Sequence, residues 1–277
     1  MKSKLIIILL IFFILMFLVS GYVVVSTLIT DEIEQDAFNG LAEMVAQEKH
    51  EETAFYETTQ PTETSQTFPN NTDIVESTEI TDEDFSAVLP EYKKIFQLNN
   101  DLFGWIRIEN TVISYPVMYT PNDPEYYLRR AFDKSDSESG TPFVDASCYD
   151  KGGIYLVYGH NMKNGSMFAE LTKYAEKKYR DEHPIIHFDT IYERGQFEVI
   201  AAFYSKVFTG DEQGFCYYQY TDLAAPAVFI EYIEQVKAAA LYDTGATAEY
   251  GDQLLTLSTC DYHEENGRFV VVAKRVS

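Results

Sequence analysis

A cysteine and an arginine lie on either side of a short polar loop near the C-terminus. Cys260 ends the run 254–260 (LLTLSTC), whose alternation predicts a strand with Cys260 on the same polar face as Thr256 and Ser258. The loop that follows ends in Asn-Gly, a pair that readily turns the chain, and Arg268 begins the next apolar run. In a hairpin, strands about 4.8 Å apart would make Cys260 and Arg268 cross-strand neighbours. A guanidinium there favours the nucleophilic thiolate and can donate hydrogen bonds to an oxyanion.

A cysteine nucleophile also needs a proton carrier, and the chain has five histidines. His160 is the favoured candidate because it follows a strand-like run and stands between Gly and Asn, which predicts a place at the rim of a groove. His263 is three residues from the cysteine and stays an alternative. His183 and His187 flank a proline near another strand, and His50 lies in an acidic segment.

Each of these residues can also have a purely structural role. A lone strand cysteine is most often a small buried residue, and Arg268 can be an exposed strand arginine that pairs with Glu264 or Glu265. His263 with Cys260 would be half of a metal site, but no second C-x-x-C or H-x-x-H accompanies them, and the loop acids lack calcium-loop spacing. We therefore expect no metal and no cofactor. Cys148 and Cys216 are expected to be buried thiols or to form a disulfide with each other.

The composition limits the class of protein. Of 277 residues, 46% are hydrophobic and 15% aromatic, so the chain can bury a core and is not disordered throughout. The net charge is −23, which argues against a nucleic-acid-binding protein because that class needs a basic face. The negative charge is concentrated in residues 31–90, which hold 16 acids and one base.

An apolar run near the N-terminus predicts a membrane anchor. Residues 5–29 are long enough to span a bilayer, two lysines precede them and several acids follow. The positive-inside bias places residues 1–4 in the cytoplasm and residues 30–277 outside the cell membrane. A cleaved signal peptide is the alternative, although the run is long for one and has no Ala-x-Ala site.

Three segments are expected after the anchor. Residues 31–54 favour a weakly amphipathic helix, and residues 55–82 are rich in Thr, Glu, Ser and Pro, which favours an extended linker. Together, residues 30–84 form an acidic extracellular stalk, and residues 85–277 form the folded domain.

The folded part favours a mainly β architecture. Pro90 can open a short helix, and helices are also predicted over 166–179 and 226–241. The remaining apolar runs are rich in Val, Ile, Tyr and Phe and are bounded by turn residues. Strands are predicted over 105–109, 112–118, 142–145, 154–158, 185–188, 197–207, 254–259 and 269–276. Eight strands with peripheral helices indicate a closed eight-stranded β-barrel.

These motifs together resemble the sortase family. The resemblance covers about residues 90–277 and is carried by 256–260 (TLSTC), Arg268 and the upstream Tyr-Gly-His that ends at His160. Residues 101–108 (DLFGWIRI) with 113–117 (ISYPV) resemble the family's opening strands, as Asn161 with 167–171 (MFAEL) resembles its later segments. The long helix before the cysteine strand is similar to that of class B.

The resemblance implies a sortase-type barrel and a cysteine transpeptidase. Such enzymes cut an LPxTG- or NPxTN-like sorting signal after Thr and transfer the protein, through a thioacyl intermediate, to an amine of peptidoglycan or to a pilin lysine. Cys260 would be the nucleophile, His160 the general acid and base, and Arg268 the group that orients substrate and stabilises the oxyanion. The resemblance offers Ser258, Thr259 and Asn122 as substrate-binding residues.

The implied partners are exported proteins with a C-terminal sorting signal and a lipid-linked peptidoglycan precursor or pilin amine. Tethering to the membrane would raise the effective concentration of both substrates. A cysteine peptidase or hydrolase, another wall-modifying enzyme such as an L,D-transpeptidase, and a non-catalytic surface adhesin are the alternatives. The sorting motif, the acceptor amine and the oligomeric state stay open from sequence.

Overall fold

The N-terminal part of the chain is one long helix. The structure, a computed structural model, describes residues 2–58, 82–148, 152–210 and 212–277, with backbone only for 2–9, 11, 50–58 and 82–84. Met1–Gly40 and Leu41–Ser277 are separate compact units. Helix α1 (Lys2–Thr58) includes both the predicted anchor and the helix predicted over 31–54. Within the described residues, it is the helix long and apolar enough to cross a membrane, and the apolar side chains of residues 12–29 are exposed, as a lipid-facing segment requires.

The predicted linker over 55–82 differs from the structure at its two ends. Residues 55–58 continue α1, and α2 (Asp82–Ala87) begins at the last linker position. The rest, residues 59–81, lies outside the described residues. Helix α3 (Pro90–Leu98) then confirms the helix predicted to open at Pro90, a residue that fits a first helical turn because its missing N–H has no partner to lose there.

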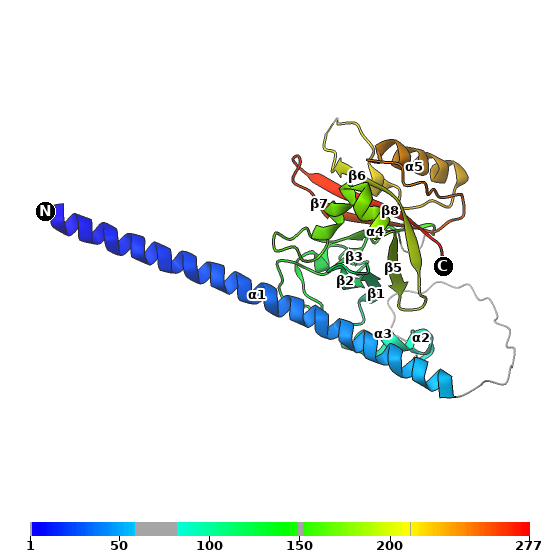
Figure 1. Ribbon diagram of the computed structural model, residues 1–277, viewed down its shortest axis with the longest axis horizontal. Helices are drawn as coiled ribbons and strands as arrows, with labels where there is room; N and C mark the ends of the chain where they lie inside the picture. The colour runs from blue at the N-terminus through cyan, green and yellow to red at the C-terminus, as the bar shows by residue number, and fades with distance from the viewer. Residues whose placement is uncertain (1, 59–81, 149–151, 211) are drawn as a thin grey trace. The chain divides into compact units, whose positions relative to one another are not determined.

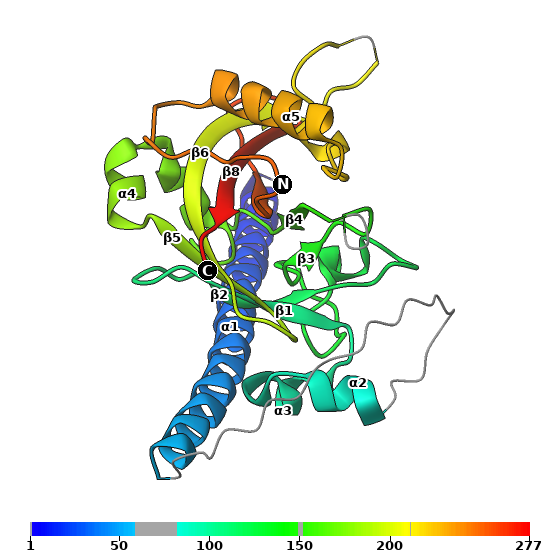
Figure 2. The same cartoon turned by 90° about the vertical axis from the view of Figure 1, so that its right-hand side faces the viewer.

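The unit Leu41–Ser277 contains the predicted closed barrel of eight strands (Figures 1 and 2). Their order around the barrel is β1-β2-β3-β4-β7-β8-β6-β5, and β5 pairs with β1 to close it. The strands are β1 (Leu102–Arg107), β2 (Ser114–Met118), β3 (Phe143–Val144), β4 (Ile154–Tyr158), β5 (Ile185–Thr190), β6 (Gln196–Lys206), β7 (Leu254–Cys260) and β8 (Gly267–Arg275).

The strand that ends at Cys260 is buried on both faces, including the face of Thr256 and Ser258 that was predicted to be polar. Helix α5 (Pro226–Ala239) lies over β6, β7 and β8 in Figure 1 and contributes Tyr232 to a buried cluster on the outside of the barrel. The phenol of Tyr232 lies 2.8 Å from the Thr256 hydroxyl, so this strand hydroxyl is satisfied by protein and not by water.

The helix predicted over 166–179 is also wrong. The segment forms a 3₁₀ helix, η2 (Ala169–Ala175), followed by α4 (Lys177–Glu182). Phe168, Leu171 and Tyr174 are all buried, and their spacing of three matches the three residues per turn of a 3₁₀ helix better than the α-helical period.

Candidate active site

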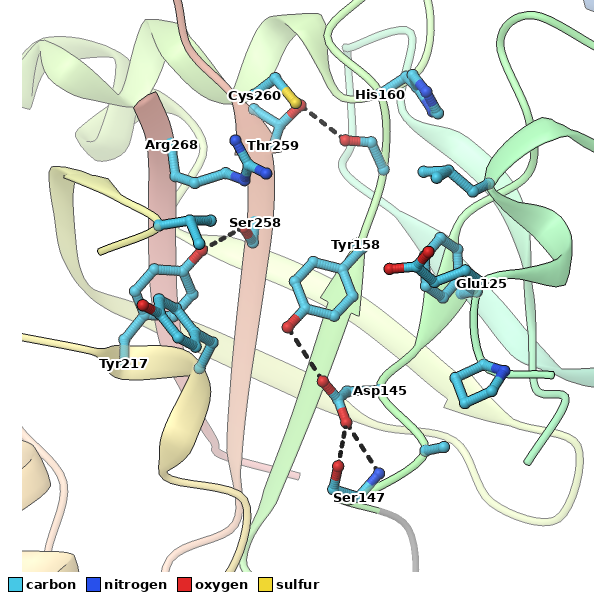
Figure 3. Close-up of a pocket in the computed structure, with 17 residues that line it drawn as sticks. Glu125, Asp145, Ser147, Tyr158, His160, Tyr217, Ser258, Thr259, Cys260 and Arg268 are labelled. Carbon is cyan, nitrogen blue, oxygen red and sulfur yellow. Dashed lines mark hydrogen bonds between the residues drawn. The ribbon is translucent and has the colours of Figure 1, made fainter. Parts of the chain in front are cut away.

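A groove of about 450 Å³ opens where β4 and β7 end and β8 begins (Figure 3). His160, Cys260 and Arg268 all line it, as do Ser258 and Thr259. The strand order places His160 just beyond β4, Cys260 at the end of β7 and Arg268 on β8, so the cysteine lies between the other two. The structure therefore brings His160 together with two residues that lie about a hundred positions further along the chain.

The pairing of β7 with β8 places Arg268 beside Cys260. The two are direct partners in the antiparallel register, and the loop between them closes with a bond from the Asp261 N–H to the Gly267 carbonyl. The Arg268 guanidinium donates to the carbonyls of Gly267, at 2.9 Å, and Asn266, at 3.3 Å. The alternative partner Glu264 pairs instead with Lys206 and His263. The Arg268 side chain also lines the groove.

The parallel pairing of β4 with β7 places His160 beside Cys260. The ladder ends at Tyr158 opposite Ser258, followed by a bond from the Gly159 N–H to the Ser258 carbonyl at 3.1 Å. His160 is therefore the residue that follows the last backbone link between the two strands.

Gly159 is required for close packing under the histidine. A Cβ on this residue would lie 2.5 Å from the ring of Phe168, closer than carbon atoms approach. The Phe168 N–H donates to the His160 carbonyl at 2.8 Å, so the same buried phenylalanine holds the histidine backbone from the opposite side. Glycine at this position lets the strand end and the following loop pack together.

Burial controls the protonation of His160. Burial lowers the pKa of the imidazole, and the positive charge of Arg129 lowers this pKa further. At neutral pH the ring is therefore mainly neutral, and it can accept a proton.

Arg129→Gln is expected to raise the pKa of His160, because it removes a positive charge that disfavours the imidazolium. Titration of the imidazole by NMR measures the change. Arg130→Gln is the matched control, since Arg130 pairs with Asp136 and is not among the causes of the His160 shift. An unchanged His160 titration in Arg129→Gln, or an equal shift in both variants, would contradict the assigned cause.

The other histidines are held elsewhere. His263 lies between two carboxylates, with Nδ1 at 2.7 Å from Asp261 and Nε2 at 3.1 Å from Glu264. His187 is on β5 and faces Glu109, and the ring of His183 packs on Tyr179. None of these three is among the residues that line the groove. Of the described histidines, His160 is therefore the one in position to serve Cys260.

The three residues predicted to bind substrate differ in their position and in their hydrogen-bond partners. Ser258 lines the groove, but it is buried and its hydroxyl lies 2.6 Å from the Tyr217 phenol. Thr259 is also buried, and its hydroxyl donates to the Gly159 carbonyl at 2.7 Å. Asn122 is exposed and lines a separate hollow beside Tyr119, so the structure does not bring it to this groove.

Two features of the groove were missed in the sequence. Tyr217, from the connection between β6 and β7, lines its wall, and burial raises the pKa of Tyr217 to about 12, so the phenol keeps its proton. Asp145 and Tyr158 form the part of the groove away from the cysteine, with the Tyr158 phenol donating to Asp145 at 3.0 Å (Figure 3). Local periodicity does not mark Tyr217 and Asp145, because they come from connections far apart in the chain, whereas Tyr158 ends the strand predicted over 154–158.

The remaining two cysteines are not joined by a disulfide in the structure. Cys148 is buried in the cluster outside the barrel, and Cys216 is partly exposed. The structure therefore does not contain the alternative disulfide between Cys148 and Cys216. The described residues contain no group of three or more His, Cys, Asp or Glu side chains arranged to hold a metal ion.

Comparison with known proteins gives one consistent family. A family profile described as the sortase domain matches residues 106–276. Sortase B of Listeria monocytogenes is 33% identical over 196 residues, which cover 69% of this chain and 76% of that protein. The sortase B structure from Bacillus anthracis has a TM-score of 0.60 at 31% identity, covering 69% and 86% of the two chains. The Staphylococcus aureus sortase B–substrate complex has a TM-score of 0.60 at 26% identity, with the same coverage.

Proposed function

Because the chain belongs to the sortase family and, within it, to class B, we propose that Cys260, His160 and Arg268 perform its reaction. Class B membership makes the chain a cysteine transpeptidase of cell-wall anchoring, which acts on sorting signals. The observation that carries the residue assignment is the convergence of these three side chains in one groove. A non-catalytic adhesin has no need of such a convergence.

The first half of the proposed reaction forms a thioester. The Cys260 sulfur attacks the carbonyl carbon of the signal's Thr, and the thiol proton passes to His160. Negative charge develops on the carbonyl oxygen, where the Arg268 guanidinium donates hydrogen bonds. The carbon–nitrogen bond then breaks, and the imidazolium gives its proton to the leaving amine. Arg268 stays protonated throughout, so it cannot shuttle the proton.

The second half transfers the acyl group. An incoming amine attacks the thioester carbon and gives a proton to His160, whose lowered pKa leaves it neutral and ready to accept. The thiolate leaves and recovers the proton, which restores the starting enzyme. The proposed acceptor is an amino group of a peptidoglycan precursor, and a pilin lysine is the alternative.

The N-terminal helix supports a location at the membrane surface. We propose that α1 anchors the chain with its N-terminus in the cytoplasm and the barrel outside. An exported protein and a lipid-linked precursor would then meet the groove close to the same surface, which raises their effective concentration.

A peptide assay separates transfer from hydrolysis. The full chain in detergent micelles is expected to cleave LPxTG- or NPxTN-like peptides after Thr and, with an oligoglycine or diaminopimelate-type amine present, to release mainly the amine-linked product. Mass spectrometry distinguishes this product from the free acid. Free acid as the only product, with and without either amine, would favour a cysteine hydrolase.

A further inference from the structure

Backbone pairing between the two strands that hold the proposed nucleophile and base ends just before those residues. The last backbone bond joins Gly159 to Ser258. Beyond this bond, the residues that follow β4 and the end of β7 form backbone hydrogen bonds with other parts of the chain. The His160 carbonyl accepts from Phe168, and Cys260 pairs with Arg268 of β8. The backbone ladder by itself therefore leaves the relative position of imidazole and thiol undetermined.

Two side chains continue the connection beyond the ladder. The Thr259 hydroxyl donates to the Gly159 carbonyl at 2.7 Å, and the Asn161 amide donates to the Cys260 carbonyl at 2.8 Å. Each bond joins a neighbour of His160 to the cysteine strand, one from the residue before it and one from the residue after it. His160 is thus held on both sides relative to Cys260.

We propose that Asn161 and Thr259 are positioning residues that fix the imidazole of His160 relative to the Cys260 sulfur. This inference rests on the proposed function, since it concerns the geometry of the same pair. Thr259 acquires a different role from the substrate contact expected from sequence, because its hydroxyl is buried and already donates to Gly159. Asn161 acts through the carbonyl of the nucleophilic residue itself.

The expected signature is a loss of rate with little loss of binding. A shift of the order of 1 Å between reacting groups can cost about 100-fold in rate. Asn161→Ala and Thr259→Val each remove one donor, and each is expected to lower kcat for thioester formation by about 10- to 100-fold with KM nearly unchanged. Thr259→Ser keeps the hydroxyl and is expected to retain most of the wild-type rate.

A neighbouring asparagine gives the matched control. Asn164 lies in the same loop, and among the described residues its amide oxygen accepts from Ser166 and not from the cysteine strand, so Asn164→Ala is expected to leave kcat unchanged. Rates are measured on the full chain in micelles with a sorting-signal peptide, and the amount of thioester trapped per chain, read by mass spectrometry, corrects for misfolded protein. Thermal unfolding of each variant is recorded in parallel.

The outcomes separate this inference from the proposed function. If Asn161→Ala and Thr259→Val unfold at lower temperature but keep the wild-type rate per active chain, or if Thr259→Ser is as slow as Thr259→Val, the positioning role is wrong. If Cys260→Ala still transfers the peptide, the proposed function itself is wrong. Slow Asn161→Ala and Thr259→Val enzymes with normal KM, beside normal Thr259→Ser and Asn164→Ala enzymes, support the inference.

Discussion

Cys260→Ala is expected to abolish cleavage and transfer, lowering the rate by at least about 10⁴-fold. The alanine removes the atom that forms the thioester, and the remaining groove residues can only bind and polarise the peptide. Since Cys260 lies at the groove and is partly exposed, a thiol-directed reagent should modify it in the wild type. The measurement is peptide cleavage by full-length wild type and variant in micelles, together with site-resolved labelling.

The labelling must be assigned by peptide mapping, because Cys216 is also partly exposed. Cys216→Ala is the matched control and is expected to keep full activity, since this residue does not line the groove. Wild-type activity in Cys260→Ala, with an unchanged unfolding temperature, would favour the adhesin alternative. Activity lost equally in both variants would indicate damage to the fold and not loss of a nucleophile.

Arg268→Ala is expected to slow thioester formation by about 100- to 1000-fold, the usual cost of losing an oxyanion donor. Arg268→Lys keeps the positive charge but loses the planar fork of donors, so an intermediate rate is expected. Steady-state kinetics with a sorting-signal peptide measure the loss, and it should fall mainly on kcat if Arg268 acts on the transition state.

The control for this prediction is on the same strand. Arg275→Ala, at the far end of β8, removes an arginine that bonds to Glu193 and Gln253 and does not line the groove. It is expected to leave kcat unchanged. Arg268 also donates to carbonyls of its own turn, so unfolding of Arg268→Ala must be measured. If Arg268→Lys were as active as wild type and Arg268→Ala only less stable, its role would be structural.

The sequence by itself determined the class of fold and the reaction. Eight apolar runs bounded by turn residues predicted the eight strands, because alternation and turn chemistry act over a few residues. The hairpin around the Asn-Gly turn predicted the pairing of Cys260 with Arg268 for the same reason, and the register confirms it. The TLSTC run together with an upstream Tyr-Gly-His predicted the family, to which the comparisons assign the chain.

Sequence reasoning was weaker where burial comes from distant segments. The alternation of β7 predicted a polar face, but it could not show that α5 and the β6–β7 connection cover that face and supply Tyr232 and Tyr217 to its hydroxyls. Asn122 was offered as a groove residue, and the path of its loop places it in another hollow. Neither outcome is encoded in local spacing.

Only the tertiary structure decided which histidine shares the groove with the cysteine. His263 is nearest in sequence, but its ring is held by Asp261 and Glu264, and it does not line the groove. His160 is a hundred positions distant, and the parallel pairing of β4 with β7 brings it to the groove. A parallel pair needs a long crossover, so its register is set by how the whole barrel closes and not by any local signal.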